Sequence, residues 1–144
     1  MKRNLSLIAV VGCFALLCGV ATAANMNSAM RIEVPFAFIA GDYTFPAGEY
    51  FVEMDRSLSA GNTLGSRLVL TKTSDSVRHI VTALPQPTGA SAAAKMTFHR
   101  YGTHYFLANV ESSGLKSRLF PTPAEKELIL AKAGPADTVS VATE

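Results

Sequence analysis

The feature that most constrains the fold of this chain is a regular alternation of apolar and polar side chains in short runs. In residues 31–39 (RIEVPFAFI) the apolar side chains of Ile32, Val34, Phe36 and Phe38 recur at every second position. A period of two places them on one face of an extended strand, so the run predicts a half-buried β-strand. Pro35 has no N–H to donate, which makes this an edge strand or breaks it there.

Similar runs follow along the chain and are separated by turn residues. They lie at 43–45, 49–55, 67–73, 77–84, 95–101 and 105–111, and the tail at 137–143 also alternates. Between the first two of these runs, Pro46-Ala47-Gly48 has the chemistry of a type I turn followed by a glycine bulge. This turn would join 43–45 to 49–55.

One helix is predicted late in the chain. Thr122 can cap its start, Pro123 suits its first position, and Glu125 completes a capping box. Gly134-Pro135 would end it, and the apolar surface at 128–130 is expected to dock on the sheet. The predicted fold class is therefore mainly β: an antiparallel sandwich or small barrel of about seven strands with one short C-terminal helix.

The first 23 residues have the three parts of a secretory signal peptide. A basic start is followed by an apolar run and by small residues before a predicted cleavage between Ala23 and Ala24. A retained membrane anchor and a lipoprotein cleaved before Cys13 are alternatives, but no charged stop follows the run, and the run continues past Cys13. We therefore expect export to the periplasm or the cell exterior and a single β-rich domain at 24–144.

Removal of the signal peptide changes the composition of the chain. Both cysteines, Cys13 and Cys18, are lost, so the mature chain has neither a thiol nor a disulfide. The 13 basic residues fall to 11 with the loss of Lys2 and Arg3, against 11 acidic residues. This balance argues against nucleic acid as a partner and against a polybasic membrane surface, and no membrane span is expected in the mature chain. No phosphate-binding or dinucleotide motif occurs, and we expect no cofactor.

The stretch at 97–110 (TFHRYGTHYFLANV) concentrates the candidate binding residues. Gly102-Thr103 predicts a two-residue type II′ hairpin loop. The resulting pairs are Tyr101 with His104, Arg100 with Tyr105, and His99 with Phe106. Alternation then places His99, Tyr101 and His104 on one face of the hairpin, and Arg100 and Tyr105 on the other.

Two hypotheses follow for these residues, each with a structural alternative. His99 and His104 could reach one metal ion, but a zinc site needs a third ligand, and cross-strand packing with solvated tips is the favoured interpretation. Arg100 lies in phase with apolar residues, so it must reach solvent or find a carboxylate. It could form an anion site, although stacking on Tyr105 is favoured.

Three segments together resemble a known family. VPFAFIAGDYTFPAGEYFV, TFHRYGTHYFLANV and LFPTPAEKEL stand in the order found in an uncharacterised family of small secreted proteins of acidobacterial type, with PAGEY and HRYGxxYFL motifs. The resemblance implies export, a bacterial source and a β-rich fold. It implies no activity, cofactor or catalytic residue. Glu111 stands where members of that family often have Trp.

The sequence favours an exported non-enzymatic β-module with a binding or structural role and a cell-envelope or small-molecule partner. The alternatives are a carrier of small apolar ligands and a metal-dependent enzyme that uses the hairpin histidines His99 and His104. An enclosed apolar cavity would favour the carrier. A third ligand beside the two histidines would favour the enzyme, and a filled core would favour the module.

Overall fold

The computed structural model describes residues 28–55, 66–87, 93–112, 114–131 and 137–143; the predicted signal peptide lies outside them. In this part of the chain the protein is mainly β, with ten strands and one short helix. The elements are β1 (Ser28–Val34), β2 (Phe38–Ala40), β3 (Tyr43–Phe45), β4 (Gly48–Asp55), β5 (Ser66–Lys72), β6 (Arg78–Gln86), β7 (Lys95–Tyr101), β8 (His104–Ser112), β9 (Leu115–Leu119), α1 (Pro123–Leu130) and β10 (Asp137–Ala142).

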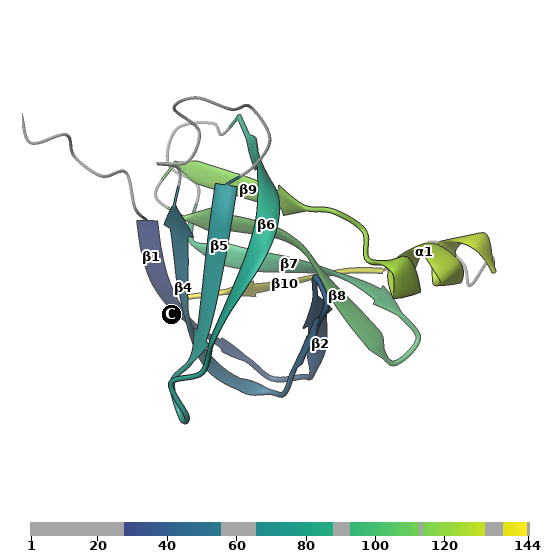
Figure 1. The fold of residues 1–144 in the computed structure, drawn as a ribbon, viewed down its shortest axis with the longest axis horizontal. Helices are drawn as coiled ribbons and strands as arrows, with labels where there is room; N and C mark the ends of the chain where they lie inside the picture. The colour runs from purple at the N-terminus through teal and green to yellow at the C-terminus, as the bar shows by residue number, and fades with distance from the viewer. Residues whose placement is uncertain (1–27, 56–65, 88–92, 113, 132–136, 144) are drawn as a thin grey trace, which may run out of the picture.

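The strands form one sheet that is folded into two layers. Its neighbours run β1-β4-β5-β6-β9-β8-β7-β10, and β2 with β3 branches from β8. Every pair is antiparallel except β2 with β8, which are parallel at Ile39 and Phe106. In Figure 1, β1, β4, β5 and β6 form a front layer that β9, β8, β7 and β10 cross from behind. Over the described residues β1 does not pair with β10, so the sheet is not closed into a barrel. The mainly β fold class with one short helix is confirmed.

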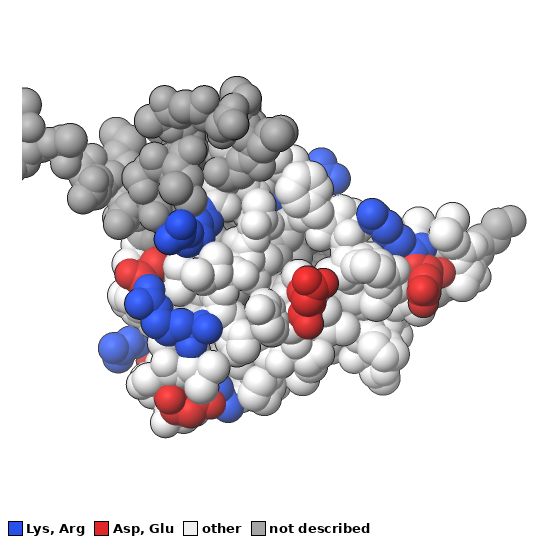
Figure 2. Space-filling view, viewed as in Figure 1, with Lys and Arg blue, Asp and Glu red and all other residues white. Residues whose placement is uncertain are grey.

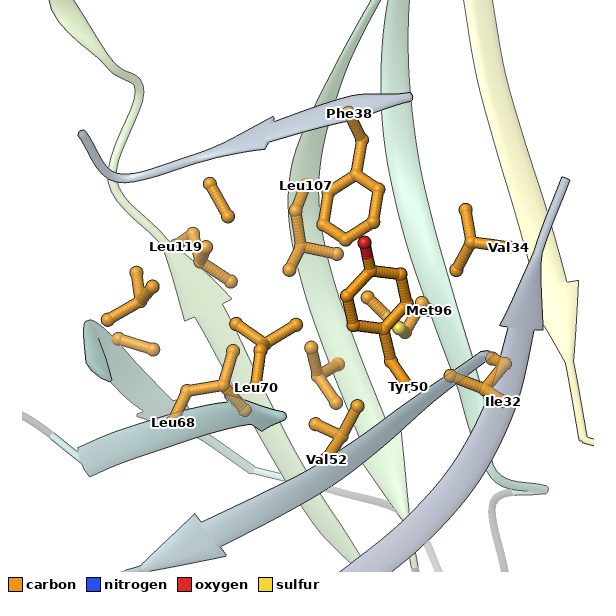
Figure 3. Close-up of a cluster of buried hydrophobic side chains, with 14 of the residues drawn as sticks. Ile32, Val34, Phe38, Tyr50, Val52, Leu68, Leu70, Met96, Leu107 and Leu119 are labelled. Carbon is orange, nitrogen blue, oxygen red and sulfur yellow. The ribbon is translucent and has the colours of Figure 1, made fainter. Parts of the chain in front are cut away.

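The core lies between the two layers and is filled with side chains (Figure 3). Phe38 is 1 % exposed and contacts three other rings, with its ring centroid 4.9 Å from that of Phe45, 5.4 Å from that of Tyr50 and 5.3 Å from that of Phe98. Full burial of one such side chain stabilises the fold by about 1.5–3 kcal/mol. The Tyr50 hydroxyl donates to the carbonyl of Pro46, which satisfies its polar end. Burial, and secondarily Asp75, raise the pKa of Tyr50 to about 12, so the hydroxyl stays protonated.

The first predicted strand is divided into two. β1 ends immediately before Pro35, as its missing N–H requires, and β2 begins at Phe38. The turn at 46–48 joins β3 to β4, but these two strands do not pair with each other. β4 already has β1 on one edge and β5 on the other, and β3 instead pairs with β2 across a turn in which Gly41 has a φ of 59°.

The helix begins as predicted but does not dock as predicted. The Thr122 side chain accepts from the N–H of Glu125, and α1 ends at Leu130, before Gly134. The expectation that the surface at 128–130 packs on the sheet is wrong, because Ile129 is 49 % and Leu130 80 % exposed. α1 projects beyond the sheet (Figure 1), and its one buried residue is Glu125 in the first turn. α1 therefore packs against the rest of the protein through its first turn.

Candidate functional site

A buried carboxylate, that of Glu125 in the first turn of α1, lies against the outer face of the β7–β8 hairpin and is bonded by two side chains. Nδ1 of His99 is 2.8 Å from Oε1 of Glu125, whose side chain is only 5 % exposed. The Tyr101 hydroxyl also bonds this carboxylate. Burial first, and then the charge of Glu125, raise the pKa of Tyr101, so its phenol remains a donor. A buried carboxylate is costly without such bonds, and here two donors offset that cost.

The positions of these side chains follow from the local sequence. His99 and Tyr101 are two residues apart on β7 and therefore share a face. Glu125 reaches them because Thr122 and Pro123 fix where the first turn of α1 begins. The signal for Glu125 in the sequence was the capping box, which predicts its place in the helix but not a partner on a strand.

A β-bulge in the hairpin determines which side chains of β8 lie on the same face as His99 and Tyr101. Thr97 pairs with Asn109 and Phe98 with Leu107, which leaves Ala108 as the extra residue. The bulge reverses the alternation beyond it, so Val110 turns into the core and is fully buried. Asn109 consequently lies on the outer face with His99. Without the bulge, alternation would have placed Asn109 in the core.

Next to the carboxylate lies an open hollow of about 340 Å³. Strands β6 to β9 and the first turn of α1 contribute to it. Its lining residues are Gln86, His99, Leu107, Ala108, Asn109, Lys116, Arg118, Leu119, Pro121 and Glu125. The volume falls within the usual range of small-molecule sites, and most of the side chains that line it are polar.

The structure separates the five residues that the sequence proposed as a binding site. The hairpin register is as predicted, with Tyr101 opposite His104, Arg100 opposite Tyr105 and His99 opposite Phe106. Gly102 has a φ of 61°, as the first residue of a type II′ turn requires. His99 and Tyr101 meet at Glu125, whereas His104 is exposed near the hairpin tip.

The pair of Arg100 and Tyr105 has a structural role on the other face. Arg100 bonds Asp137, which lies directly opposite it on β10, and it also bonds Tyr105. These bonds, with that to Asp137 the stronger cause, raise the pKa of Arg100. The Tyr105 ring stacks on Phe36 with centroids 3.9 Å apart. Arg100 thus has the carboxylate partner that its position demands, and nothing in the local sequence around Arg100 identifies that partner as Asp137.

The cluster does not have the geometry of a metal centre. Within the described ranges no three side chains of His, Cys, Asp or Glu lie where they could hold one ion together. The third histidine, His79, lies on β6 and contacts the rings of Tyr43 and Phe45. A histidine oriented by a carboxylate can also act as a general base, but His99 bonds no hydroxyl group in the part of the chain described.

A second buried carboxylate lies near the hollow on the same outer face. Oε1 of Glu111 is 2.8 Å from Nζ of Lys116, and its Oε2 is 3.5 Å from Nζ of Lys95. The bond to Lys116 is the main cause that lowers the pKa of Glu111; burial opposes it. Folding lowers the pKa of Glu111, so its ionised carboxylate stabilises the folded protein at pH values above the ordinary carboxyl pKa of 4.5. This stabilisation is lost as the pH falls through the lowered pKa.

We expect Glu111→Gln to lower the free energy of unfolding at pH 7 by about 1–2 kcal/mol, because both lysines lose a charged acceptor. The difference from the parent should shrink to nothing in strong acid, where Glu111 is itself neutral. Urea denaturation at pH 7 and at low pH measures both quantities. Glu33→Gln, at an exposed position on β1, is the control and should change little. A loss that does not depend on pH would contradict this account.

Comparisons with known proteins leave the site to be interpreted from its own geometry. No protein-family model, no curated protein and no solved structure matches the chain. In the described segments, no helix combines the length and apolar character needed to cross a membrane.

Proposed function

We propose that this chain is an exported, non-enzymatic β-module that binds a small polar molecule in the hollow beside α1. The observation that carries the proposal is the buried Glu125 carboxylate, which His99 and Tyr101 hold in place at the wall of a hollow of about 340 Å³. Fixed polar groups at a concave surface are what gives small-molecule sites their specificity. The proposal of export rests on the predicted signal peptide at 1–23. The resemblance to the family of small secreted proteins rests on the three sequence segments given above.

The core is filled with side chains, which favours the β-module over a carrier of apolar ligands. A carrier needs an enclosed apolar cavity, whereas in the described interior the ring of Phe38 packs against those of Phe45, Tyr50 and Phe98. Figure 3 shows Phe38 and Tyr50 among the aliphatic side chains that fill the same space. His99 bonds Glu125 while His104 is exposed, and among the described residues no third ligand completes a metal site with them, which favours binding over metal-dependent catalysis.

The distribution of charge supports a small partner rather than nucleic acid. The face in Figure 2 carries Lys and Arg in small groups near Asp and Glu, with uncharged surface between them. Recognition of a nucleic-acid backbone needs a continuous basic surface instead.

The test uses the mature chain from Ala24 onward and a blocking substitution. Asn109 lines the hollow and is half-buried, so Asn109→Trp should fill part of it. Thr71→Trp, at a half-buried position on β5 in the other layer, is the matched control. Backbone NMR spectra are recorded against sugars, amino acids, small organic acids, a fatty acid and Zn²⁺.

We expect at least one small polar compound to shift the resonances of the hollow saturably, in the parent and in the control but not in Asn109→Trp. Binding of the fatty acid in the interior would favour the carrier. Binding of Zn²⁺ at His99 and His104 would favour the enzyme. If no compound shifts the hollow, the proposal fails.

A further inference from the structure

We propose that the ligand of this hollow is a small organic acid whose carboxylate is bound by Arg118, with Asn109 and Lys116 as further donors. This inference rests on the proposed function and names the class of molecule that the site takes. It comes from the balance of charges around the hollow and from the strand register that places the donors together.

The negative charges around the hollow already have partners. Glu125, which lines it, is bonded by His99 and Tyr101. Glu111, which lies beside it, holds both Lys116 and Lys95. The acidic groups are therefore saturated, and two lysines around one carboxylate leave an excess of positive charge.

Of the two cations that line the hollow, Lys116 pairs with Glu111, whereas Arg118 pairs with no described residue. Arg118 is exposed on β9 and lines the hollow. The internal segments outside the described residues, 56–65, 88–92 and 132–136, contain no Asp or Glu that could neutralise it. Among its Lys, Arg, Asp and Glu residues, the lining holds the two cations Lys116 and Arg118 and the one anion Glu125, which is a formal charge of +1.

The register of the sheet places further donors next to this guanidinium. Asn109 on β8 lies directly opposite Arg118 on β9, and Gln86 on β6 lies opposite Lys116. Opposite residues of antiparallel strands have Cβ atoms about 4.5–5.5 Å apart. Lys116 is two residues from Arg118 and shares its face. A guanidinium, two amides and an ammonium thus form one continuous group of donors.

The chemistry of these donors selects a singly charged oxyanion. The guanidinium presents two parallel N–H groups that fit the two oxygens of a carboxylate. Phosphate would fit the same fork, but it carries up to two charges, and the Glu125 carboxylate on the wall of the hollow repels the second. A net lining charge of +1 matches one carboxylate. A hollow of about 340 Å³ has room for a small organic acid.

The experiment compares molecules that differ only in this group. The mature protein is titrated with acetate, succinate, benzoate and glucuronate, each alongside its neutral amide or alcohol, and with glucose 6-phosphate. NMR follows the side chains of Arg118 and Asn109. We expect carboxylates to bind saturably and their neutral counterparts at least about tenfold more weakly, and we expect binding to weaken as NaCl is added.

Arg118→Gln should weaken carboxylate binding about tenfold or more, because the charged fork is replaced by one amide. Arg78→Gln is the control, since Arg78 is an exposed arginine on β6 that pairs with Glu53 away from the hollow. Equal binding of acids and neutral counterparts, tighter binding of the phosphate, or an unchanged affinity in Arg118→Gln would each overturn the assignment. Neutral polar molecules that bind in the hollow when acids do not would leave the proposed function standing and remove only this inference.

Discussion

Phe38→Ala should lower the free energy of unfolding by about 3–5 kcal/mol. Phe38 is 1 % exposed, and its ring touches those of Phe45, Tyr50 and Phe98, so its removal leaves a cavity whose walls come from several strands. Such walls cannot collapse together without breaking strand pairing. A domain of this size is stable by only about 5–15 kcal/mol, so urea denaturation at 25 °C should show a much earlier midpoint.

Phe120→Ala is the matched control for this substitution. The Phe120 side chain is 53 % exposed, and its loss should change the free energy of unfolding by no more than about 0.5 kcal/mol. Phe38→Leu should fall between the two, because it keeps most of the buried volume. If Phe38→Ala costs no more than Phe120→Ala, the contacts of the Phe38 ring do not stabilise the core.

The second large effect is expected at the carboxylate that attaches α1. His99→Ala removes a bonded partner from Glu125, whose side chain is 5 % exposed, and should cost about 2 kcal/mol. This loss of stability is smaller than for a fully buried ion pair, because the His99 side chain is 39 % exposed and water can enter in its place. The double variant His99→Ala/Glu125→Leu should recover part of the loss, because the buried charge is then absent.

The hairpin supplies its own control for this prediction. His104→Ala removes an exposed imidazole near the tip of the same hairpin and should be neutral within about 0.5 kcal/mol. Urea denaturation gives the stabilities, and proteolysis near α1 reports whether the helix is released before the sheet unfolds. Equal effects of His99→Ala and His104→Ala would show that Glu125 does not depend on His99.

Local chemistry explains why much of the sheet could be predicted. The β7–β8 hairpin was predicted to the exact register at its tip because Gly102 and Thr103 define a short turn that fixes the pairs nearest to it. The end of β1 at Pro35 follows from a missing donor in the same way. β9 was missed because its five residues include Lys116 and Arg118 on the outer face and carry little apolar signal.

The candidate site could be predicted only in part, because it depends on relations between distant segments. Alternation placed His99 and Tyr101 on one face, but it had no means to place Glu125, which reaches them from a helix 24 residues beyond Tyr101. The helix was expected to dock through 128–130 because apolar residues normally seek a core. The contact of Glu125 with His99 attaches the first turn of α1 instead. The bulge that turns Asn109 outward has no signature in the sequence.

The position of β8 in the sheet also bears on the order in which the chain folds. Among the described strands, only β8 has three strand neighbours: β7, β9 and β2. β7, β8 and β9 follow one another along the chain and form a local antiparallel meander, as β4, β5 and β6 do. β6, β10 and β2 join the β7–β9 meander over longer separations. Short loops cost the least entropy to close. The meander at 95–119 can thus form early, and the strands that join it can then assemble on a template that already carries seven of the ten residues lining the hollow.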